Sequence, residues 1–195
     1  MSIWERPDAI DREAFLAING AHAHGFDVVM EAASSMVLWF PLYAFFLWLI
    51  LRRHGDKALL WSLPLIALMI LCSDKGSVLL FKETVQRLRP CHEPSLSGLV
   101  HLVPKECGGQ YGFVSSHASN HFGIAVFMIG VLRAAPRWAV VALLGWAALI
   151  AYSRVYLGVH YPGDVLVGGL YGAMIGSLAA LIFKRFIAKR PPSGA

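Results

Sequence analysis

Three short stretches of the chain carry side chains that together suit the handling of a phosphate group. They are residues 82–90, 114–117 and 153–164, and each borders an apolar segment. Charged groups beside long apolar runs are energetically expensive to place, so they commonly mark a functional site. Together the stretches supply cations for phosphate oxygens, two histidines and a carboxylate.

Lys82, Arg89 and Arg154 are the candidate ligands for phosphate oxygens. Phosphoryl transfer requires positive charge around the equatorial oxygens, and a guanidinium group binds two oxygens at once. Arg89 precedes a proline, so it is expected where a helix ends. Arg87 is interpreted differently, as a side chain that extends along apolar surface toward the membrane interface.

Ser115, Ser116 and His117 stand at the start of an expected helix. Free backbone N–H groups at a helix N-terminus bind anions, and the two hydroxyl groups add donors. His117 is therefore placed to protonate a leaving oxygen. His160 is followed four residues later by Asp164, whose carboxylate can return to the imidazole and fix its tautomer.

Metal binding is the main alternative for the histidines. His117 and His121 have the i, i+4 spacing of a zinc pair, but Ala118 stands where the zinc-protease motif needs glutamate. We therefore expect no metal site and no cofactor.

The composition predicts an all-α, polytopic membrane helix bundle. Of the 195 residues, 57% are hydrophobic and 15% charged, and the mean hydropathy is +0.58, which excludes an ordinary soluble domain. The chain is expected to form a single domain. Five apolar runs approach the roughly 20 residues needed to cross a bilayer: residues 28–51, 58–81, 117–132, 138–152 and 164–183.

Loop charges predict the orientation of these spans. Basic residues gather in three regions that five spans would place on one side, and by the positive-inside rule that side is cytoplasmic. They are Arg52, Arg53, Lys57, Arg133, Arg137, Lys184, Arg185, Lys189 and Arg190. All three motifs then fall on the outer face. The net charge of +5 is explained by these topology signals, so nucleic acid is not an expected partner.

Two further segments are expected on the outer side. Residues 1–27 form an N-terminal segment in which residues 8–24 have the pattern of a helix lying in the membrane interface; a mobile polar tail is the alternative. Residues 91–113 form an outer loop. An oxidising compartment permits a disulfide between Cys91 and Cys107, and two free thiols are the alternative.

Two details of the spans concern packing more than chemistry. Gly168, Gly172 and Gly176 form one smooth helical face that allows close approach of a neighbouring helix. Asp74 and Lys75, late in the second span, are interpreted as structural, although a position bordering the site is the alternative.

The motifs resemble the signature of the type 2 phosphatidic acid phosphatase superfamily, K-x6-RP, PSGH and SR-x5-H-x3-D. The first and third blocks match in full. The second matches at Ser115 and His117, while Val114 replaces proline and Ser116 replaces glycine. The resemblance implies that His160 is the nucleophile that forms a phosphohistidine and that Asp164 orients it. It also implies that His117 is the general acid and that Lys82, Arg89, Ser115, Ser116 and Arg154 bind the phosphoryl group, without a metal.

A small, outward-facing member of this family looks most like bacterial undecaprenyl-diphosphate phosphatases of the inner membrane. The resemblance therefore implies removal of a terminal phosphate from a membrane lipid at the periplasmic or external face, with undecaprenyl diphosphate as the first candidate. Phosphatidylglycerophosphate, phosphatidic acid, diacylglycerol diphosphate and lipid A 1-phosphate are alternatives. Two competing functions are a transporter that uses the cations only to bind a lipid phosphate head group, and a soluble vanadate-dependent haloperoxidase.

Overall fold

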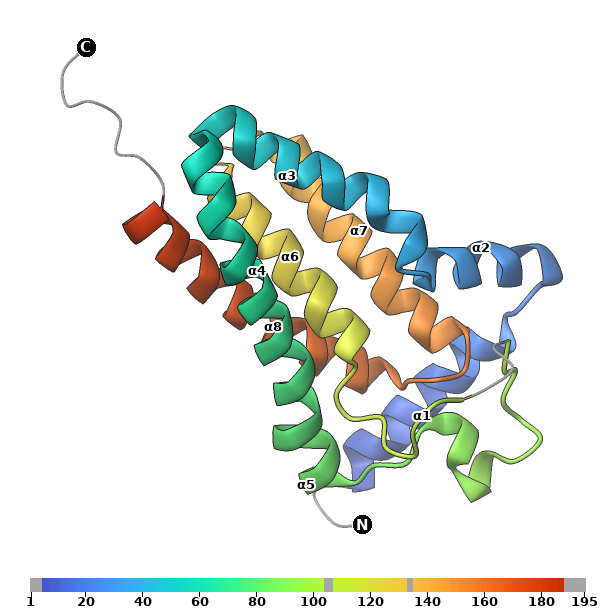
Figure 1. Cartoon of the computed structure of the whole chain (residues 1–195). Helices are drawn as coiled ribbons and strands as arrows, with labels where there is room; N and C mark the ends of the chain where they lie inside the picture. Colours follow the sequence, from blue (N-terminus) through green and yellow to red (C-terminus); the bar gives the residue numbers. More distant parts are fainter. Residues whose placement is uncertain (1–4, 104–106, 133–134, 188–195) are drawn as a thin grey trace.

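The protein is a bundle of helices (Figure 1). The computed structural model describes residues 5–103, 107–132 and 135–187, and within these ranges every named regular element is helical. The all-α prediction is confirmed. The main helices are α1 Glu5–Gly20, α2 His24–Ser34, α3 Phe40–His54, α4 Asp56–Ser77, α6 Ser116–Val131, α7 Arg137–Tyr156 and α8 Pro162–Ile182. Short helical turns cover Val37–Trp39, Val78–Lys82, α5 Glu83–Val85, Pro90–His92, Pro94–Leu96 and Phe183–Ile187.

Helix α6 lies between α4 and α7 and packs most extensively against α8 (Figure 1). Glycines on α8 make this close approach possible. A Cβ atom on Gly168 would lie 2.6 Å from the carbonyl oxygen of Ser115, and one on Gly172 would lie 1.9 Å from that of Ser119. The packing interpretation of the glycine stripe is confirmed, and the stripe holds the start of α6 against the start of α8.

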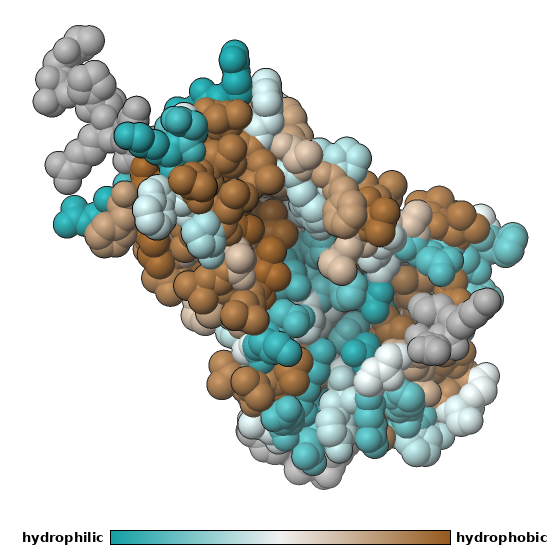
Figure 2. Space-filling model, viewed as in Figure 1, coloured by the Kyte–Doolittle hydropathy of each residue, from teal (hydrophilic) through white to brown (hydrophobic). Residues whose placement is uncertain are grey.

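Apolar side chains on the outside of the bundle identify a membrane protein. Asp56–Val85, Arg137–Tyr156 and Pro162–Ile187 are long and apolar enough to cross a bilayer. One exposed stripe of α8 consists of Leu166, Leu170, Met174, Leu178 and Leu181, each more than half exposed. Figure 2 shows apolar surface over the α4 side of the bundle and hydrophilic surface at the end that carries α1. Because α6 has only 16 residues, the count of five spans stays a prediction.

The first predicted span, residues 28–51, consists of two helical segments that pass the length and hydropathy test together, so a single span here stays a prediction. Its helical segments, His24–Ser34 and Val37–His54, meet at an angle of 66°. Ser35 adopts an extended conformation (φ −76°, ψ 124°), and Pro41 lies in the first turn of α3, where its missing N–H costs no hydrogen bond. Serine competes with helical hydrogen bonds and favours such a boundary. The bend directs α2 away from the bundle axis (Figure 1).

The predicted N-terminal helix is present as α1. It contacts α7 and α8, and it lies across the end of the bundle near their connection (Figure 1). Phe15 is fully buried, and its ring meets that of Tyr161 edge-on with centroids 5.4 Å apart. The alternative of a mobile tail is therefore wrong for Glu5–Gly20. A position in the membrane interface stays a prediction.

Candidate active site

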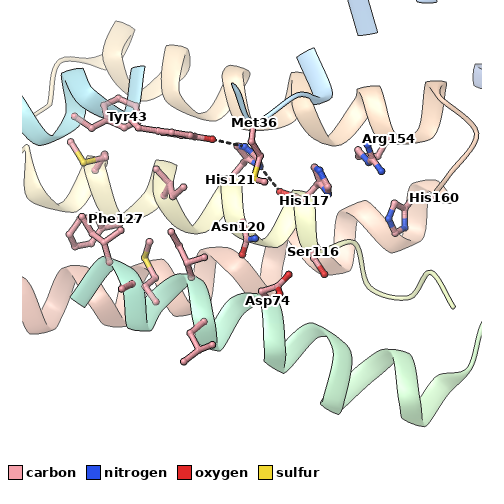
Figure 3. A pocket seen from close by; sticks show the side chains of 18 of the residues that line it. Met36, Tyr43, Asp74, Ser116, His117, Asn120, His121, Phe127, Arg154 and His160 are labelled. Atoms are coloured by element: carbon pink, nitrogen blue, oxygen red, sulfur yellow. Dashed lines mark hydrogen bonds between the residues drawn. The ribbon is translucent and has the colours of Figure 1, made fainter. Parts of the chain in front are cut away.

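Residues of all three sequence motifs line one cavity of about 1030 Å³. Figure 3 shows Ser116, His117, Arg154 and His160 gathered toward one end of it. Six of the predicted residues line it: Lys82, Arg89, Ser116, His117, Arg154 and His160. Ser115 and Asp164 are fully buried behind this wall. The structure thus brings all eight predicted site residues into one region.

His160 and Asp164 form a buried pair whose hydrogen bonds determine the imidazole tautomer. Arg89 Nη1 lies 3.2 Å from His160 Nε2, and a guanidinium group can only donate. His160 Nε2 is therefore the acceptor. The ring proton lies on Nδ1, which donates to Asp164 Oδ2 at 3.3 Å. The nitrogen that faces the cavity thus carries a lone pair.

The surroundings of His160 keep its ring uncharged. The side chain is almost fully buried, and burial disfavours the imidazolium form. The positive charges of Arg89, Arg154 and Lys82 act in the same direction. Together they hold the pKa of His160 well below its usual 6.5. A neutral ring whose Nε2 carries a lone pair is the form required of a nucleophile, and here that lone pair accepts a hydrogen bond from Arg89.

The three predicted cations reach the cavity from different segments. Lys82 Nζ donates to Ser116 Oγ at 3.2 Å, and Arg154 Nη1 donates to Ser34 Oγ at the end of α2. Arg89 also donates to the Val159 carbonyl oxygen at 3.2 Å. Within the described residues, Nε of Arg89 and Nε of Arg154 are buried without a hydrogen-bond partner. Such donors are costly unless an anion uses them.

The start of α6 provides a second group of donors. Ser115 is the N-cap, and its hydroxyl accepts the Ala118 N–H at 3.5 Å. The Ser115 N–H donates to the Asp164 main-chain oxygen at 3.0 Å, which ties α6 to α8 beside the dyad. Figure 3 shows His117 and His160 among the side chains of the cavity wall. The helix N-terminus thus adds partial positive charge to the same end of the cavity.

His121, one turn beyond His117, is structural. Its Nδ1 lies 2.7 Å from the His117 carbonyl oxygen, so Nδ1 donates and Nε2 accepts from the Tyr43 hydroxyl at 3.0 Å. Both ring nitrogens of His121 therefore have hydrogen-bond partners within the protein. Among the described residues, the one group with metal-ligand spacing is Cys91, His92 and Cys107.

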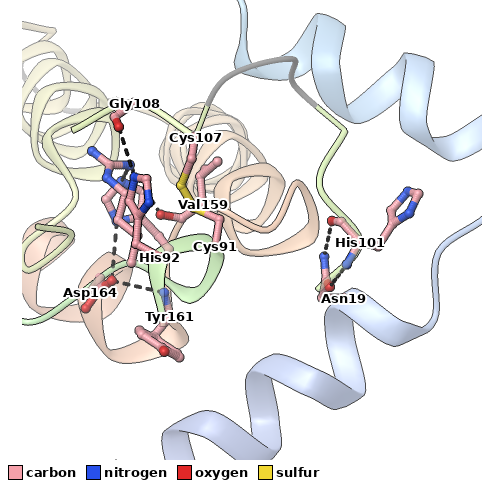
Figure 4. Close-up of a disulfide and its surroundings, with 11 residues drawn as sticks. Asn19, Cys91, His92, His101, Cys107, Gly108, Val159, Tyr161 and Asp164 are labelled. Atoms are coloured by element: carbon pink, nitrogen blue, oxygen red, sulfur yellow. Dashed lines mark hydrogen bonds and ion pairs between the residues drawn. A yellow bond between two sulfur atoms is a disulfide. The ribbon is translucent and has the colours of Figure 1, made fainter. Parts of the chain in front are cut away.

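Cys91 and Cys107 are joined in a disulfide, which leaves no thiolates for a metal (Figure 4). Their Cα atoms are 6.2 Å apart, and the bond closes the outer loop directly after Arg89. The loop is also held by the Arg89 N–H, which donates to the Gln110 carbonyl oxygen at 3.0 Å. Residues 104–106 of the predicted 91–113 loop lie outside the described residues.

Arg87 was misinterpreted from the sequence. It is not an interfacial side chain but binds three carboxylates: Asp164 at 3.1 Å, Asp11 at 2.7 Å and Asp8 at 2.8 Å. No local pattern indicates this, because the partners lie more than 70 positions away in the chain.

Asp74 also belongs to the cavity. It lines the wall, whereas Lys75 points to the exposed side of α4, so the two do not share a face. Asp74 therefore borders the site, which was the alternative to a purely structural role.

Comparison with known proteins gives a consistent result. The family model of the PAP2 superfamily matches residues 63–188. A lipid A 4'-phosphatase of Bacteroides thetaiotaomicron is 36% identical over 181 residues, which cover 92% of this chain and 80% of that protein. An undecaprenyl-diphosphatase of Sulfolobus acidocaldarius is 28% identical over 83% of this chain and 71% of its own length. The crystal structure of a PAP2-type phosphatidylglycerolphosphate phosphatase from Bacillus subtilis has the same fold, with a TM-score of 0.74 at 20% identity, covering 96% of this chain and 90% of that one.

Proposed function

Because the chain belongs to the PAP2 superfamily, and so is a phosphoric ester hydrolase that acts on membrane lipid phosphates, we propose that His160 is its nucleophile and that no metal takes part. One observation carries this proposal. Arg89 donates to His160 Nε2, so the imidazole presents a lone pair to the cavity while Asp164 holds its other nitrogen.

The proposed reaction has two steps. His160 Nε2 attacks phosphorus, the bond from phosphorus to the lipid oxygen breaks, and His117 gives that oxygen a proton. The resulting phosphohistidine carries positive charge on its ring, which Asp164 stabilises through the Nδ1–H. Water then attacks phosphorus and gives its proton to His117. The phosphorus–nitrogen bond breaks, and inorganic phosphate leaves.

Lys82, Arg89 and Arg154 are proposed to bind the phosphoryl oxygens, with Ser116 and the α6 N-terminus assisting. These groups are held before substrate arrives, by Ser116, Val159 and Ser34 respectively. Preorganised donors of this kind lower the barrier because they need not reorient as charge develops on the oxygens. The same cations repel a proton from His160, so binding and activation of the nucleophile depend on one arrangement.

The cavity is also suited to a lipid. From the phosphate end it continues between α3, α4 and α6 along apolar side chains, including Phe46, Leu63, Ile66, Phe127 and Met128. Figure 3 shows Phe127 and Tyr43 far along the cavity from His160. An acyl or prenyl chain would replace water there, which is favourable in proportion to the apolar area covered.

We propose a lipid A-type phosphate monoester as the first candidate substrate. The support is the 36% identity to a lipid A 4'-phosphatase over most of both chains. This replaces the ranking from the sequence, in which undecaprenyl diphosphate came first; that lipid is now the second candidate, supported by the more distant diphosphatase.

The site is proposed to face the periplasm or cell exterior. Arg53 at the end of α3 donates to the Leu132 carbonyl oxygen at the end of α6, so the basic ends of the spans meet opposite the motifs. By the positive-inside rule that end is cytoplasmic.

Phosphate release from a substrate panel tests the proposal. Purified protein in EDTA is given lipid A, undecaprenyl diphosphate, phosphatidylglycerophosphate and phosphatidic acid. We expect release with lipid A to be fastest and to fall by at least about 10³-fold in His160→Asn and His117→Asn, as for loss of a nucleophile or its proton donor. His24→Asn, an exposed imidazole outside the cavity, is the matched control.

Undiminished release by His160→Asn would rule out the phosphohistidine. Loss of activity in EDTA, restored by a divalent cation, would rule out the metal-independent reaction. A protein that binds lipid phosphate without releasing phosphate would instead fit the transporter alternative.

A further inference from the structure

Asp164 is held by more than its partner histidine. Its Oδ2 accepts hydrogen bonds from His160 Nδ1 at 3.3 Å and from the Tyr161 N–H at 3.0 Å, and its Oδ1 accepts from Arg87 Nη1 at 3.1 Å. Arg87 also covers the ring of Tyr161, with its guanidinium carbon 4.0 Å from the centroid. Both carboxylate oxygens are therefore fixed, Oδ2 by His160 and the Tyr161 N–H and Oδ1 by Arg87.

Arg87 is in turn held by the N-terminal helix. Asp11 and Asp8 of α1 accept from Nη1 and Nη2 at 2.7 and 2.8 Å. Asp11 uses its other oxygen to accept the Gly163 N–H at 2.7 Å, directly beside Asp164. A Cβ on Gly163 would lie 2.7 Å from that carboxylate, so glycine is needed for this approach. Helix α1 thus reaches the surroundings of Asp164 at two places, the Arg87 side chain and the Gly163 N–H.

We propose that Arg87 is a positioning residue for the His160–Asp164 dyad and that α1 supplies the carboxylates that hold Arg87 in place. The proposal rests on the proposed function, in which this dyad provides the nucleophile. It extends the working site to α1, which lies outside residues 63–188 that match the family model.

The charge of Arg87 has a defined consequence. Burial lowers the pKa of Arg87, but the carboxylates of Asp164, Asp11 and Asp8 outweigh burial and raise it, so the group stays charged. A permanent cation on Oδ1 weakens the pull of Asp164 on a proton at His160. Removing that cation should therefore make His160 easier to protonate.

Other charged and titratable groups also face the dyad, and the test has to separate Arg87 from them. They are Lys82 before α5, Arg89 after it, His117 on α6, Arg154 on α7, Tyr161 beside α8, and Asp11 on α1. A substitution at position 87 leaves each of these side chains in the protein, so a shift in the titration of His160 reports the loss of Arg87 together with its contact to Asp11.

The experiment compares Arg87→Gln and Arg87→Lys with the unaltered protein. Arg12→Gln is the matched control, because Arg12 binds Asp8 and Glu93 of the same network but does not touch Asp164. The readouts are the pKa of His160, from ¹⁵N NMR of histidine-labelled protein with the signal assigned by its loss in His160→Gln, and the pH profile of kcat/KM.

In Arg87→Gln we expect the His160 pKa and the acid limb of kcat/KM to rise by about 1 pH unit, from loss of one nearby charge. We expect kcat to fall roughly 10- to 100-fold, as for residues that orient a catalytic group, with KM little changed. Arg87→Lys keeps the positive charge but loses the planar guanidinium group that binds several carboxylates at once. It should therefore keep the His160 pKa of the unaltered protein while kcat stays low. Arg12→Gln should leave the His160 pKa unchanged.

An unchanged His160 pKa in folded Arg87→Gln, or an equal shift in Arg12→Gln, would overturn the proposal. If Arg87→Gln does not fold, a wild-type kcat in Arg87→Lys overturns it instead. The NMR titration needs no substrate. It therefore distinguishes failure of this inference from failure of the proposed function, in which the unaltered protein would release no phosphate.

Discussion

At the scale of single residues, Arg89 connects phosphate binding to nucleophile activation in the proposed reaction. Its guanidinium donates to His160 Nε2 and to the Val159 carbonyl oxygen, and its Nε is buried without a partner among the described residues. A phosphate that takes over these donors also releases the lone pair of Nε2. The proposed nucleophile, His160 Nε2, is therefore covered by Arg89 until an anion enters the cavity.

His160 should make the stability of the protein depend on pH. Its folded pKa lies below the unfolded value of about 6.5, so the stability from the neutral ring is complete above pH 6.5 and is lost as the pH falls. For each pH unit below 6.5, the free energy of unfolding of the unaltered protein should fall by about 1.4 kcal/mol more than that of His160→Gln. Thermal unfolding of the solubilised protein between pH 8 and 4.5 measures this.

If the stability of the unaltered protein and that of His160→Gln changed equally with pH across that range, the assignment of a neutral buried ring would be contradicted. Asp8 and Glu93 do not confuse the comparison. Burial raises their pKa, but hydrogen bonds to Arg12 and Ser95 and nearby arginine charge outweigh it, so the pKa is lowered. Their contribution is present above about pH 4 and is lost only below it, in both proteins.

Spacing along the chain predicted the residues that line the cavity and also Asp164 behind His160, but not Arg87, which binds Asp164 in turn. Some site residues are close in the sequence, as Lys82 is to Arg89 and His160 is to Asp164. A local sequence motif can therefore predict that each pair lies together. The contact between Arg87 and Asp11 joins positions 76 apart. Nothing in either local sequence encodes it, since it depends on how α1 docks on the bundle.

At the scale of elements, the pairing of α6 with α8 positions both histidines. Gly172 lies against the main chain of Ser119, and the Ser115 N–H reaches the main-chain oxygen of Asp164. The starts of the two helices are therefore held against each other. Glycine spacing predicted this contact, because four-residue steps place small residues on one helical face.

Gly172→Ala should damage both stability and activity. The added Cβ would lie 1.9 Å from the Ser119 carbonyl oxygen, so the helices must separate, at a cost of about 1–3 kcal/mol for such overpacking. We expect a lower melting temperature and reduced phosphate release. Gly145→Ala on α7 is the matched control, since its Cβ meets nothing within 4 Å. Equal melting temperatures for both variants would refute this account of the stripe.

The bend between α2 and α3 shows a limit of sequence reasoning at this scale. Residues 28–51 are apolar throughout apart from Glu31 and two serines, so hydropathy indicates one span. The break at Ser35 matters because it places Ser34 on Arg154. Average hydropathy over a window cannot detect a boundary that a single residue sets.

At the scale of the whole molecule, the bundle is polarised. The proposed phosphate-binding residues lie at one end, and Arg53 and His54 bind the C-terminal carbonyl oxygens of α6 at the other. Loop charges predicted this separation, because the positive-inside rule acts on whole loops and needs no contacts. The orientation itself remains a prediction.

Cysteine labelling tests the orientation. In a Cys72→Ala background, Leu99→Cys in the outer loop and Lys57→Cys at the start of α4 are both exposed positions. A membrane-impermeant maleimide added to intact spheroplasts should label the Leu99→Cys protein at once and the Lys57→Cys protein only after lysis. The reverse pattern would place the site in the cytoplasm.

Asp164 also begins a helix, since its side chain accepts the Tyr161 N–H at the first turn of α8. An asparagine amide oxygen accepts the same bond. In the genetic code aspartate and asparagine differ by a single base. A gene copy with Asp164→Asn would keep the start of α8 while losing the charge that serves His160. In the proposed mechanism, a duplicated gene is therefore one mutation away from a folded pseudoenzyme that binds lipid phosphates without hydrolysing them.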